Sequence, residues 1–332
     1  MRRISVIIPL YNEKESLIEL HRGISEELLK LDADAEVIFV NDGSTDGSEQ
    51  VLRELQQQDA RIRIIRFRRN FGKSSALSAG FREARNDIIV TMDADLQDLP
   101  SEMHKLIEKL EEGSDLVSGW KRDRKDPIGK RWPSKLYNFV TSALTGVPLH
   151  DMNCGFKAYR KRVAEEIKVY GEMHRYIPVL ASYRGFVVSE VPVVHQKRKF
   201  GRSKYGLTRF VSGFFDLMTV IMLTRYNRKP LHAFGVFGLV LLALGSAVLL
   251  YLTVGWFSGN WIGDRPAFML AILLLIVGMQ FIFFGLLAEM IAYASKREED
   301  YSITRIEEGG KTRSDEGENL VEQPAAGAEP GG

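Results

Sequence analysis

Apolar and polar positions follow two alternating periods along residues 1–230. Short apolar runs typical of strands are followed by longer segments whose apolar residues recur every three or four positions, as on one face of a helix. The expected strands span residues 4–9, 35–40, 62–67 and 87–92, and the expected helices span residues 15–31, 48–58 and 73–84. This order predicts an α/β fold with a mostly parallel sheet that is covered by helices on both faces.

The chain becomes far more apolar after residue 230. No charged side chain occurs in residues 233–257 or in residues 266–288. Each run exceeds the roughly 20 apolar residues that cross the hydrocarbon core of a bilayer. Because the connection between the runs is short, residues 231–295 are expected to form a hairpin of two transmembrane helices, in preference to two buried helices of a soluble protein.

A third apolar pattern lies just before these two runs. Apolar side chains recur at helical spacing at Leu207, Phe210, Val211, Phe214, Phe215, Met218, Ile221 and Met222. Residues 206–230 are therefore expected to form amphipathic helices in the membrane interface, although packing against a protein core gives the same stripe. Residues 296–332 are charged and then rich in Gly, Pro and Ala, which is typical of a disordered tail.

Basic residues indicate on which side of a membrane each end lies. The stretch before the first apolar run contains Lys197, Arg198, Lys199, Arg202, Lys204, Arg209, Arg225, Arg228 and Lys229. Lys296 and Arg297 follow the second run, whereas the connection holds only Arg265. The positive-inside rule then places residues 1–205 and both termini in the cytoplasm, at the cell (inner) membrane. Met1 leads directly into a strand, without the pattern of a signal peptide.

Overall composition narrows the function classes only a little. The formal net charge of the 332 residues is +2, so no nucleic-acid partner is expected. The single cysteine, Cys154, excludes an intramolecular disulfide framework and a cysteine-rich zinc site.

The most informative polar pattern is Asp93-Ala94-Asp95, at the end of the strand 87–92. Mg²⁺ and Mn²⁺ prefer oxygen ligands and are commonly held by one or two carboxylates together with substrate phosphates. Two other strand ends, Tyr11-Asn12-Glu13 and Asp42-Gly43-Ser44, are expected at the same rim of the sheet. This rim suits a nucleoside diphosphate bound with a metal, although a solvated turn is the simpler explanation of an isolated Asp-x-Asp.

Two other nucleotide-binding classes are disfavoured. Gly72-Lys73-Ser74 looks like the end of a phosphate-binding loop, but Phe67 stands where the leading glycine is required. No Gly-x-Gly-x-x-Gly follows the first strand, so a nicotinamide or flavin dehydrogenase is not expected either.

Four ordered motifs carry a resemblance to a known family. They are residues 6–13 (VIIPLYNE), 40–46 (VNDGSTD), 69–73 (RNFGK) and 92–98 (MDADLQD). With the two apolar runs, they resemble inverting family 2 glycosyltransferases, and more narrowly the polyprenyl-phosphate glycosyltransferases, which include dolichyl-phosphate mannose synthases and bacterial undecaprenyl-phosphate glucosyltransferases. The resemblance covers residues 4–295. It implies a Rossmann-like domain of the glycosyltransferase A type over residues 1–205.

The resemblance also implies roles for individual residues. The nucleotide would contact Pro9, Tyr11, Glu13, Asp42, Lys73 and Asp93. The ligands of Mg²⁺ or Mn²⁺ would be Asp93, Asp95 and Gln97. A basic loop with His195, Arg198, Arg202 and Lys204 would close over the diphosphate, and Arg122, Arg131 and Ser134 would bind the lipid phosphate. Asp151 matches the acidic position near the reacting centre. Any of these could instead be a turn residue or part of a solvated charged face.

The expected reaction moves a sugar from a nucleotide-sugar, with UDP-glucose favoured, to undecaprenyl phosphate. A phosphate acceptor is already largely anionic near neutral pH, so Asp151 is expected to orient the acceptor or stabilise the sugar's positive charge rather than to act as a strong base. The alternatives are a GDP-mannose-dependent synthase, a hydroxyl-acceptor lipid glycosyltransferase and a non-catalytic nucleotide-sugar binder. A processive polysaccharide synthase is disfavoured, because Gln-x-x-Arg-Trp and additional spans are absent.

Two protein partners are expected as well. The first apolar run contains Gly235, Gly238 and Gly245, which permit close helix approach and a homo-oligomer. A flippase that receives the glycosylated lipid is the expected downstream partner.

Overall fold

The computed structural model describes residues 1–122, 128–196, 199, 208–226, 229–259, 261, 266–294, 305–308 and 311–314. The first half of the α/β domain contains β1 (Arg2–Leu10), α1 (Leu17–Lys30), β2 (Ala33–Asn41), α2 (Ser48–Gln58), β3 (Ile62–Arg66), α3 (Lys73–Glu83) and β4 (Ile88–Thr91). The second half contains the 3₁₀ turn η1 (Pro100–Glu102), α4 (Met103–Glu111), β5 (Leu116–Trp120), α5 (Ile128–Thr145), β6 (Lys157–Arg160), α6 (Lys161–Glu166), the 3₁₀ turn η2 (Met173–Tyr176), α7 (Ile177–Tyr183) and β7 (Val188–Pro192). Then follow α8 (Thr208–Arg225), α9 (Pro230–Phe257), α10 (Pro266–Ala294), β8 (Arg305–Glu308) and β9 (Lys311–Ser314).

The central sheet has the strand order β3-β2-β1-β4-β6-β5-β7. Strands β3, β2, β1 and β4 are mutually parallel, β6 is antiparallel to both of its neighbours, and β7 is parallel to β5. The predicted mostly parallel α/β fold is therefore confirmed. The expected helix over residues 48–58 matches α2, and the six other expected elements agree within two residues at each end.

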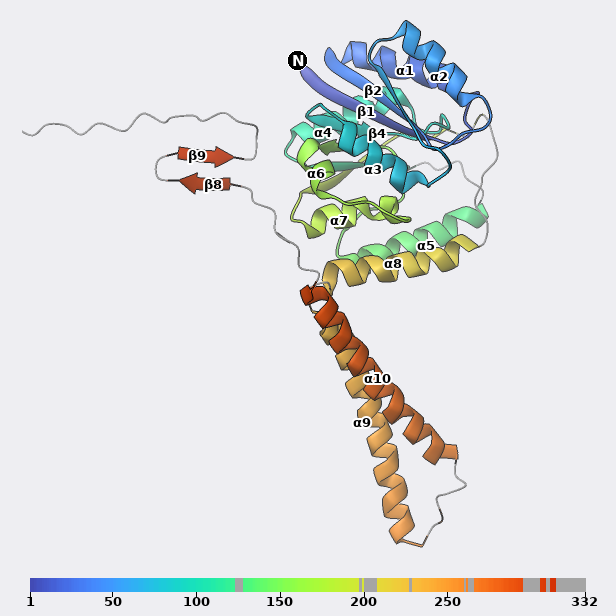
Figure 1. Ribbon diagram of the computed structural model, residues 1–332, viewed down its shortest axis with the longest axis vertical. Helices are drawn as coiled ribbons and strands as arrows, with labels where there is room; N and C mark the ends of the chain where they lie inside the picture. The colour runs from blue at the N-terminus through green and yellow to red at the C-terminus, as the bar shows by residue number, and fades with distance from the viewer. Residues whose placement is uncertain are drawn as a thin grey trace, which may run out of the picture.

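Helices cover the sheet on both faces (Figure 1). One face packs against α1, α2 and α4, through side chains such as Leu20, Leu52 and Leu106. The other packs against α3, α6 and α7. The strands between them are nearly continuous apolar runs because they are buried on both faces, and each fully buried Leu or Ile contributes about 1.5–3 kcal/mol.

Gly80 lets α3 lie directly against the sheet. A Cβ placed on Gly80 would come within 2.4 Å of the Ile7 side chain on β1. No larger residue fits unless the helix or the Ile7 side chain moves, so glycine at this position permits the close approach of α3 to β1. The first residue of that helix, Lys73, is thereby held at the carboxyl end of the sheet.

Helices α5 and α8 lie side by side between the α/β body and the apolar hairpin (Figure 1). On α8, Leu217 and Val220 are buried against the domain, whereas Phe215 and Met218 are exposed. The exposed Phe215 and Met218 belong to the apolar stripe expected over residues 206–230, whereas the buried Leu217 and Val220 lie outside it, so α8 is apolar toward the domain as well as on its open face.

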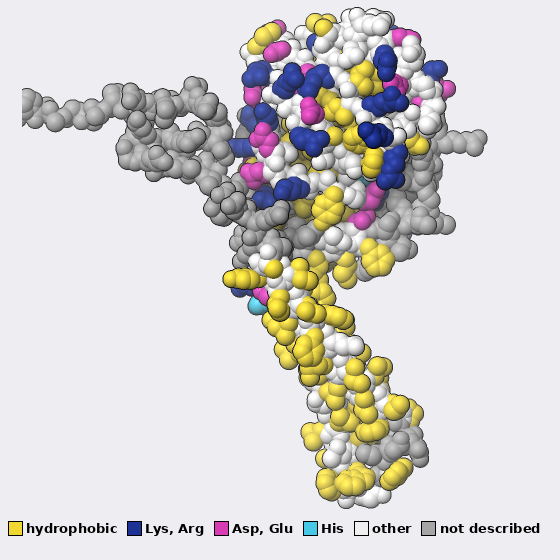
Figure 2. Space-filling model, viewed as in Figure 1, with side chains coloured by type: hydrophobic (Ala, Val, Ile, Leu, Met, Phe, Trp, Pro, Cys, Tyr) yellow, Lys and Arg dark blue, Asp and Glu magenta, His cyan; other side chains and the backbone are white. Residues whose placement is uncertain are grey.

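Helices α9 and α10 form the expected hairpin, and both are long and apolar enough to cross a membrane. Figure 2 shows hydrophobic side chains along these helices and charged side chains over the α/β body. Glycines let the two helices touch: a Cβ on Gly238 would lie 2.7 Å from the Gly278 carbonyl oxygen, and one on Gly245 would lie 3.0 Å from that of Ala271. Gly238 and Gly245, expected to permit an oligomer, are thus used within the hairpin.

The carboxylate of Glu289 on α10 accepts a hydrogen bond from the backbone N–H of Leu231, at 3.1 Å. Leu231 is the second residue of α9, whose first N–H groups have no partner within their own helix. The base of the hairpin is therefore joined by a polar contact next to the α/β domain.

Strands β8 and β9 form an antiparallel pair in the tail where disorder was expected. In the sequence Gly309 and Gly310 separate the two runs, and Gly-Gly between short strands is a hairpin signal that a purely compositional argument overlooks. The other tail residues lie outside the part of the chain that the structure describes.

Candidate nucleotide-sugar site

The carboxyl ends of β1, β2 and β4 meet at one rim, as the sequence predicted. They are followed by Tyr11, Asp42 and Asp93 respectively. Because β6 runs the opposite way, the segment leading into it, residues 151–156, reaches the same rim. Strands β5 and β7 end there too and add Lys121 and His195, so residues from six strand ends converge.

The loops after β1 and β2 are joined by side chains. The N–H of Asn12 donates to Ser44 Oγ at 2.9 Å, and the N–H of Thr45 donates to Asn12 Oδ1 at 2.8 Å. Asn12 has φ 55°, an uncommon conformation for a residue other than glycine, and these contacts hold it there. This rigid pair of loops contains Tyr11 and Glu13, two of the predicted nucleotide contacts.

Asp42 holds the loop before α3. Its two carboxylate oxygens accept the N–H groups of Phe71 and Gly72, at 2.7 and 2.9 Å. The next residue, Gly43, has φ +72°, and a Cβ there would lie 2.5 Å from the backbone of Arg69. Each carboxylate oxygen retains a further acceptor site, so the predicted contact with the nucleotide base is compatible with this loop-holding role, which the sequence did not reveal.

Asp93 stands at the centre of the rim, where it pairs with the ammonium group of Lys73. Gly155 lies against the carboxylate, and a Cβ on Gly155 would be 2.6 Å from Asp93 Oδ2. Sequence reasoning gave Gly155 no role, although it falls in the segment after Asp151. Lys73 therefore belongs to this carboxylate site. As the sequence predicted, it is not part of a phosphate-binding loop after the first strand, because Lys73 follows β3.

Asp95 is buried close to Asp93, and its Oδ1 accepts the N–H of Gln97 at 3.1 Å. Leu96, between Asp95 and Gln97, has φ 59°, so the chain turns sharply directly after the Asp-x-Asp segment. No group of three or more His, Cys, Asp or Glu side chains suited to a metal occurs among the described residues. Two carboxylates on one turn fit a hard divalent cation whose remaining ligands are substrate phosphates and waters.

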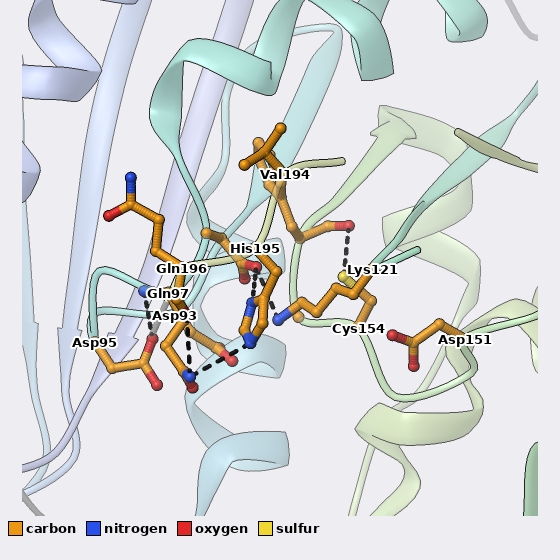
Figure 3. A network of polar contacts seen from close by, with 12 residues as sticks. Asp93, Asp95, Gln97, Lys121, Asp151, Cys154, Val194, His195 and Gln196 are labelled. Atoms are coloured by element: carbon orange, nitrogen blue, oxygen red, sulfur yellow. Dashed lines mark hydrogen bonds and ion pairs between the residues drawn. The ribbon is translucent and has the colours of Figure 1, made fainter. Parts of the chain in front are cut away.

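Gln97 connects the Asp-x-Asp turn to the segment after β7 (Figure 3). Its amide nitrogen lies 3.4 Å from His195 Nε2 and 3.5 Å from the Gln196 carbonyl oxygen. An isolated antiparallel bridge pairs Asp98 with His195. The first residue of the predicted basic loop is therefore attached to the predicted metal turn. Arg198, Arg202 and Lys204, the other predicted residues of that loop, lie outside the described residues.

Lys121 is a residue that the sequence reasoning missed. Its Nζ lies 2.8 Å from Asp98 Oδ1; the Asp98 side chain is fully buried and that of Lys121 is 12% exposed. Burial opposes ionisation of both groups, but their mutual attraction prevails, so the pKa of Asp98 is lowered and that of Lys121 is raised. The predicted lipid-phosphate residue, Arg122, is instead exposed, with its guanidinium 5.9 Å from the centre of the Trp120 ring. Lys121 and Arg122 are adjacent in the chain, but successive side chains along a strand end point in opposite directions, so the two residues have different surroundings.

Asp151 is 1% exposed at the opposite side of the rim from Asp95 (Figure 3), and its Oδ1 accepts the N–H of Asn153 at 3.3 Å.

Lys157, which the sequence reasoning also missed, is fully buried and donates to the Cys154 carbonyl oxygen. Burial lowers the pKa of Lys157. The sequence does contain a signal for this residue, because Lys157 interrupts the apolar run Phe156-Lys157-Ala158 of a strand. Burial also raises the pKa of the Cys154 thiol to about 12, so this thiol is not a nucleophile.

Of the remaining predicted lipid-phosphate residues, Arg131 and Ser134 lie on α5, where the structure does not describe their side chains. Pro9 lies within β1, opposite Val40 of β2.

A mostly parallel sheet with an Asp-x-Asp turn at the end of β4 defines a glycosyltransferase with an A-type fold. The chain belongs to glycosyl transferase family 2: residues 5–168 match the profile described as "Glycosyl transferase family 2". The resemblance found in the sequence is thereby confirmed.

Two relatives match over most of their own length. Dodecaprenyl-phosphate galacturonate synthase of Rhizobium johnstonii is 38% identical over 315 residues, which cover 91% of this chain and 92% of the relative. Undecaprenyl-phosphate 4-deoxy-4-formamido-L-arabinose transferase of Pseudomonas fluorescens is 36% identical over 291 residues, which cover 87% of this chain and 84% of the relative. Both matches are long enough to extend beyond the α/β domain.

A solved structure confirms the fold. Glucosyl-3-phosphoglycerate synthase from Mycobacterium tuberculosis, in complex with Mn²⁺, uridine diphosphate and phosphoglyceric acid, superposes with a TM-score of 0.52 at 20% identity, covering 67% of this chain and 78% of that chain.

Proposed function

We propose that this protein transfers a sugar from a nucleotide-sugar to a polyprenyl phosphate. The observation that carries the proposal is the similarity, at 38% and 36% identity, to two enzymes whose names state a polyprenyl-phosphate product or acceptor. Those matches cover about nine-tenths of this chain, too much to be limited to the α/β domain. An activity shared only through the nucleotide-binding fold would not account for that coverage.

On the donor side, the diphosphate and a divalent cation, Mg²⁺ or Mn²⁺, would lie at Asp93 and Asp95. The metal would neutralise charge on the leaving diphosphate. Lys73 now neutralises Asp93, and it would be released to a phosphate oxygen when the cation arrives. The loops that contain Tyr11, Glu13 and Asp42 would hold the nucleoside, since they are rigidly joined at the adjacent strand ends.

On the acceptor side, Asp151 is the carboxylate best placed to act on the sugar. Departure of the diphosphate leaves positive charge on the sugar, and a buried carboxylate stabilises that charge more strongly than one in water. The acceptor phosphate, with a second pKa of about 6, needs little help from a base. Asp151 would therefore stabilise the sugar's positive charge and orient the acceptor, rather than act as a strong base.

The apolar hairpin would hold the enzyme where its acceptor resides. A polyprenyl tail cannot leave a bilayer readily, because each buried methylene contributes about 0.8 kcal/mol. Helices α9 and α10 would span the membrane, with the exposed apolar face of α8 in the interface and the α/β domain and both termini in the cytoplasm. A homo-oligomer and a flippase partner remain proposals, and an oligomer would need contacts beyond the Gly238 and Gly245 surface that the hairpin already uses.

The identity of the transferred sugar can be determined by a donor-panel experiment. The sequence favoured UDP-glucose, whereas the names of the two relatives state galacturonate and 4-deoxy-4-formamido-L-arabinose. Purified, detergent-solubilised protein should be incubated with undecaprenyl phosphate, Mg²⁺ and a panel of UDP- and GDP-linked sugars. The panel should include glucose, galacturonate and 4-deoxy-4-formamido-L-arabinose. Mass spectrometry should then detect one glycosylated lipid phosphate, which disappears when the metal is chelated.

Two results would reject the proposal. Nucleotide binding without a lipid product from any donor would favour a non-catalytic binder. Transfer to a lipid hydroxyl but not to undecaprenyl phosphate would assign the protein to the hydroxyl-acceptor class.

A further inference from the structure

A stacked pair of rings lies beside the catalytic rim. The rings of Trp120 and His150 are nearly parallel, at 18°, with their centres 4.2 Å apart. The guanidinium of Arg122 lies over the same Trp120 ring, 5.9 Å from its centre. An imidazole and a guanidinium therefore share one aromatic platform.

Glu190 fixes the orientation of His150. Its carboxylate accepts the backbone N–H of His150 at 2.9 Å and also contacts the ring nitrogen Nδ1. Because Nδ1 faces a carboxylate, it carries the proton, and Nε2 is the nitrogen available to a ligand. The His150 side chain is 63% exposed, although its main chain is held in place. An oriented but exposed imidazole suits ligand binding better than core packing.

The position of His150 connects the catalytic centre with the helices next to the hairpin. It immediately precedes Asp151, and its carbonyl oxygen accepts a hydrogen bond from Asn138 Nδ2 on α5, at 2.7 Å. Helix α5 packs beside α8, which leads toward α9 (Figure 1). Glu190 and Trp120 also share one face of the sheet, since their strands are in register at Ser118–Glu190 and Trp120–Pro192.

We propose that His150 and Arg122, held on Trp120, bind the phosphate group of the polyprenyl acceptor and position it for attack. This inference rests on the proposed function and adds three residues, His150, Trp120 and Glu190, to the acceptor side. Nε2 of His150 accepts the P–OH proton of a phosphate monoanion, or donates to the dianion when the ring is protonated. Arg122 supplies fixed positive charge, and the Trp120 ring holds the His150 and Arg122 side chains together.

The test separates a ligand contact from a purely structural role. In His150→Asn the amide nitrogen replaces Nδ1 and still donates to Glu190, but nothing replaces Nε2. Steady-state kinetics with undecaprenyl phosphate in mixed micelles should give an acceptor KM about tenfold higher, as expected when one hydrogen bond to a charged group is lost. The donor KM should stay within about twofold. His150→Gln, whose amide reaches the Nε2 position, should recover part of the loss, and Trp120→Leu should reproduce it.

His104→Asn is the matched control, because His104 pairs with Glu27 on the opposite, α1 and α4 side of the sheet. It should leave both KM values unchanged. A wild-type acceptor KM in His150→Asn, or a raised donor KM with the acceptor KM unaffected, would overturn the inference while leaving the proposed function intact. If the wild-type enzyme itself makes no glycosylated lipid phosphate, the proposed function fails first.

Discussion

Lys121 and Asp98 form a buried ion pair beneath the nucleotide-sugar site, with Nζ 2.8 Å from Oδ1. Asp98 follows the Asp-x-Asp turn, and Lys121 follows β5, so the pair links two strand ends that are not adjacent in the sheet. Asp98 is also bridged to His195 after β7. One buried carboxylate thus joins three segments that the proposed mechanism needs in fixed positions.

Removing one member of this pair should be costly. Asp98→Asn leaves the Lys121 charge buried without its counter-ion, and the free energy of unfolding should fall by about 3–5 kcal/mol, measured by urea unfolding in detergent. The double variant Asp98→Leu/Lys121→Met should lose less than either single variant. Arg2→Met, which breaks the exposed pair with Glu111, is the control and should cost at most about 1 kcal/mol. Equal losses in the buried and exposed variants would contradict this view of Asp98.

The same pair predicts a pH dependence of stability. Burial alone would raise the pKa of Asp98, but Lys121 and His195 beside it hold the pKa below its usual value. A carboxyl group with a lowered folded-state pKa stabilises the protein above its unfolded pKa of about 3.9, and that contribution is lost as the pH falls through the folded value. Wild-type stability should therefore drop below about pH 4 more steeply than that of the Asp98→Leu/Lys121→Met variant, as acid titration of unfolding would reveal.

Asp95→Asn should weaken metal-dependent donor binding. Even residues that only support a metal ligand contribute about 10- to 100-fold to metal affinity, so loss of a ligand should raise the metal concentration for half-maximal activity at least tenfold. Asp87→Asn is the matched control, because Asp87 precedes β4 at its opposite end and is 67% exposed. Identical metal titrations for the two variants would remove Asp95 from the metal site.

Gly155→Ala should damage catalysis without unfolding the protein. The added Cβ would stand 2.6 Å from Asp93 Oδ2, so either the carboxylate or the segment leading into β6 must move. A displacement of about 1 Å at a reacting centre can cost about a hundredfold in rate, and kcat/KM for the donor should fall on that scale. Gly235→Ala, whose Cβ would meet only Leu231 at 3.6 Å, should be unaffected. Full donor turnover in Gly155→Ala would show that the contact with Asp93 is irrelevant.

Asp151→Asn should lower kcat about a hundredfold, the effect typical of losing one group that stabilises transition-state charge. Nucleotide binding, followed by fluorescence quenching, should be retained, because Asp151 lies across the rim from Asp95 (Figure 3). Undiminished turnover in this variant would rule out a catalytic role, and loss of nucleotide binding would instead assign Asp151 to the donor site.

Gly238→Leu should separate α9 from α10. Even a Cβ at this position would lie 2.7 Å from the Gly278 carbonyl oxygen, and overpacking of this kind typically costs about 1–3 kcal/mol. Thermal unfolding in detergent should begin earlier than in the wild type. Gly235→Leu lies away from that contact and serves as the control, and equal melting of the two variants would mean that the helices do not pack through Gly238.

The fold class, the family and the two apolar helices could all be predicted from the amino-acid sequence. Those features depend on periodic patterns and local motifs, such as the buried runs of β1 and β2, the Asp-x-Asp after β4 and the uncharged segments of α9 and α10. Each of these patterns lies within contiguous residues of the chain. The strands β5, β6 and β7 left no comparable pattern, because polar residues or glycine interrupt their apolar runs, whereas the equally short β4 is an unbroken run.

Which side chains meet at the rim could not be predicted in this way and follows from the three-dimensional fold. Lys121 and Arg122 are adjacent in the chain, yet strand geometry turns one toward Asp98 and the other toward Trp120. Gly155 lies against Asp93, and Lys157 lies opposite Thr91, because β6 runs antiparallel to β4, a direction that no local motif encodes. Contacts between residues distant in sequence depend on strand order and register, and these are set by packing of the whole domain.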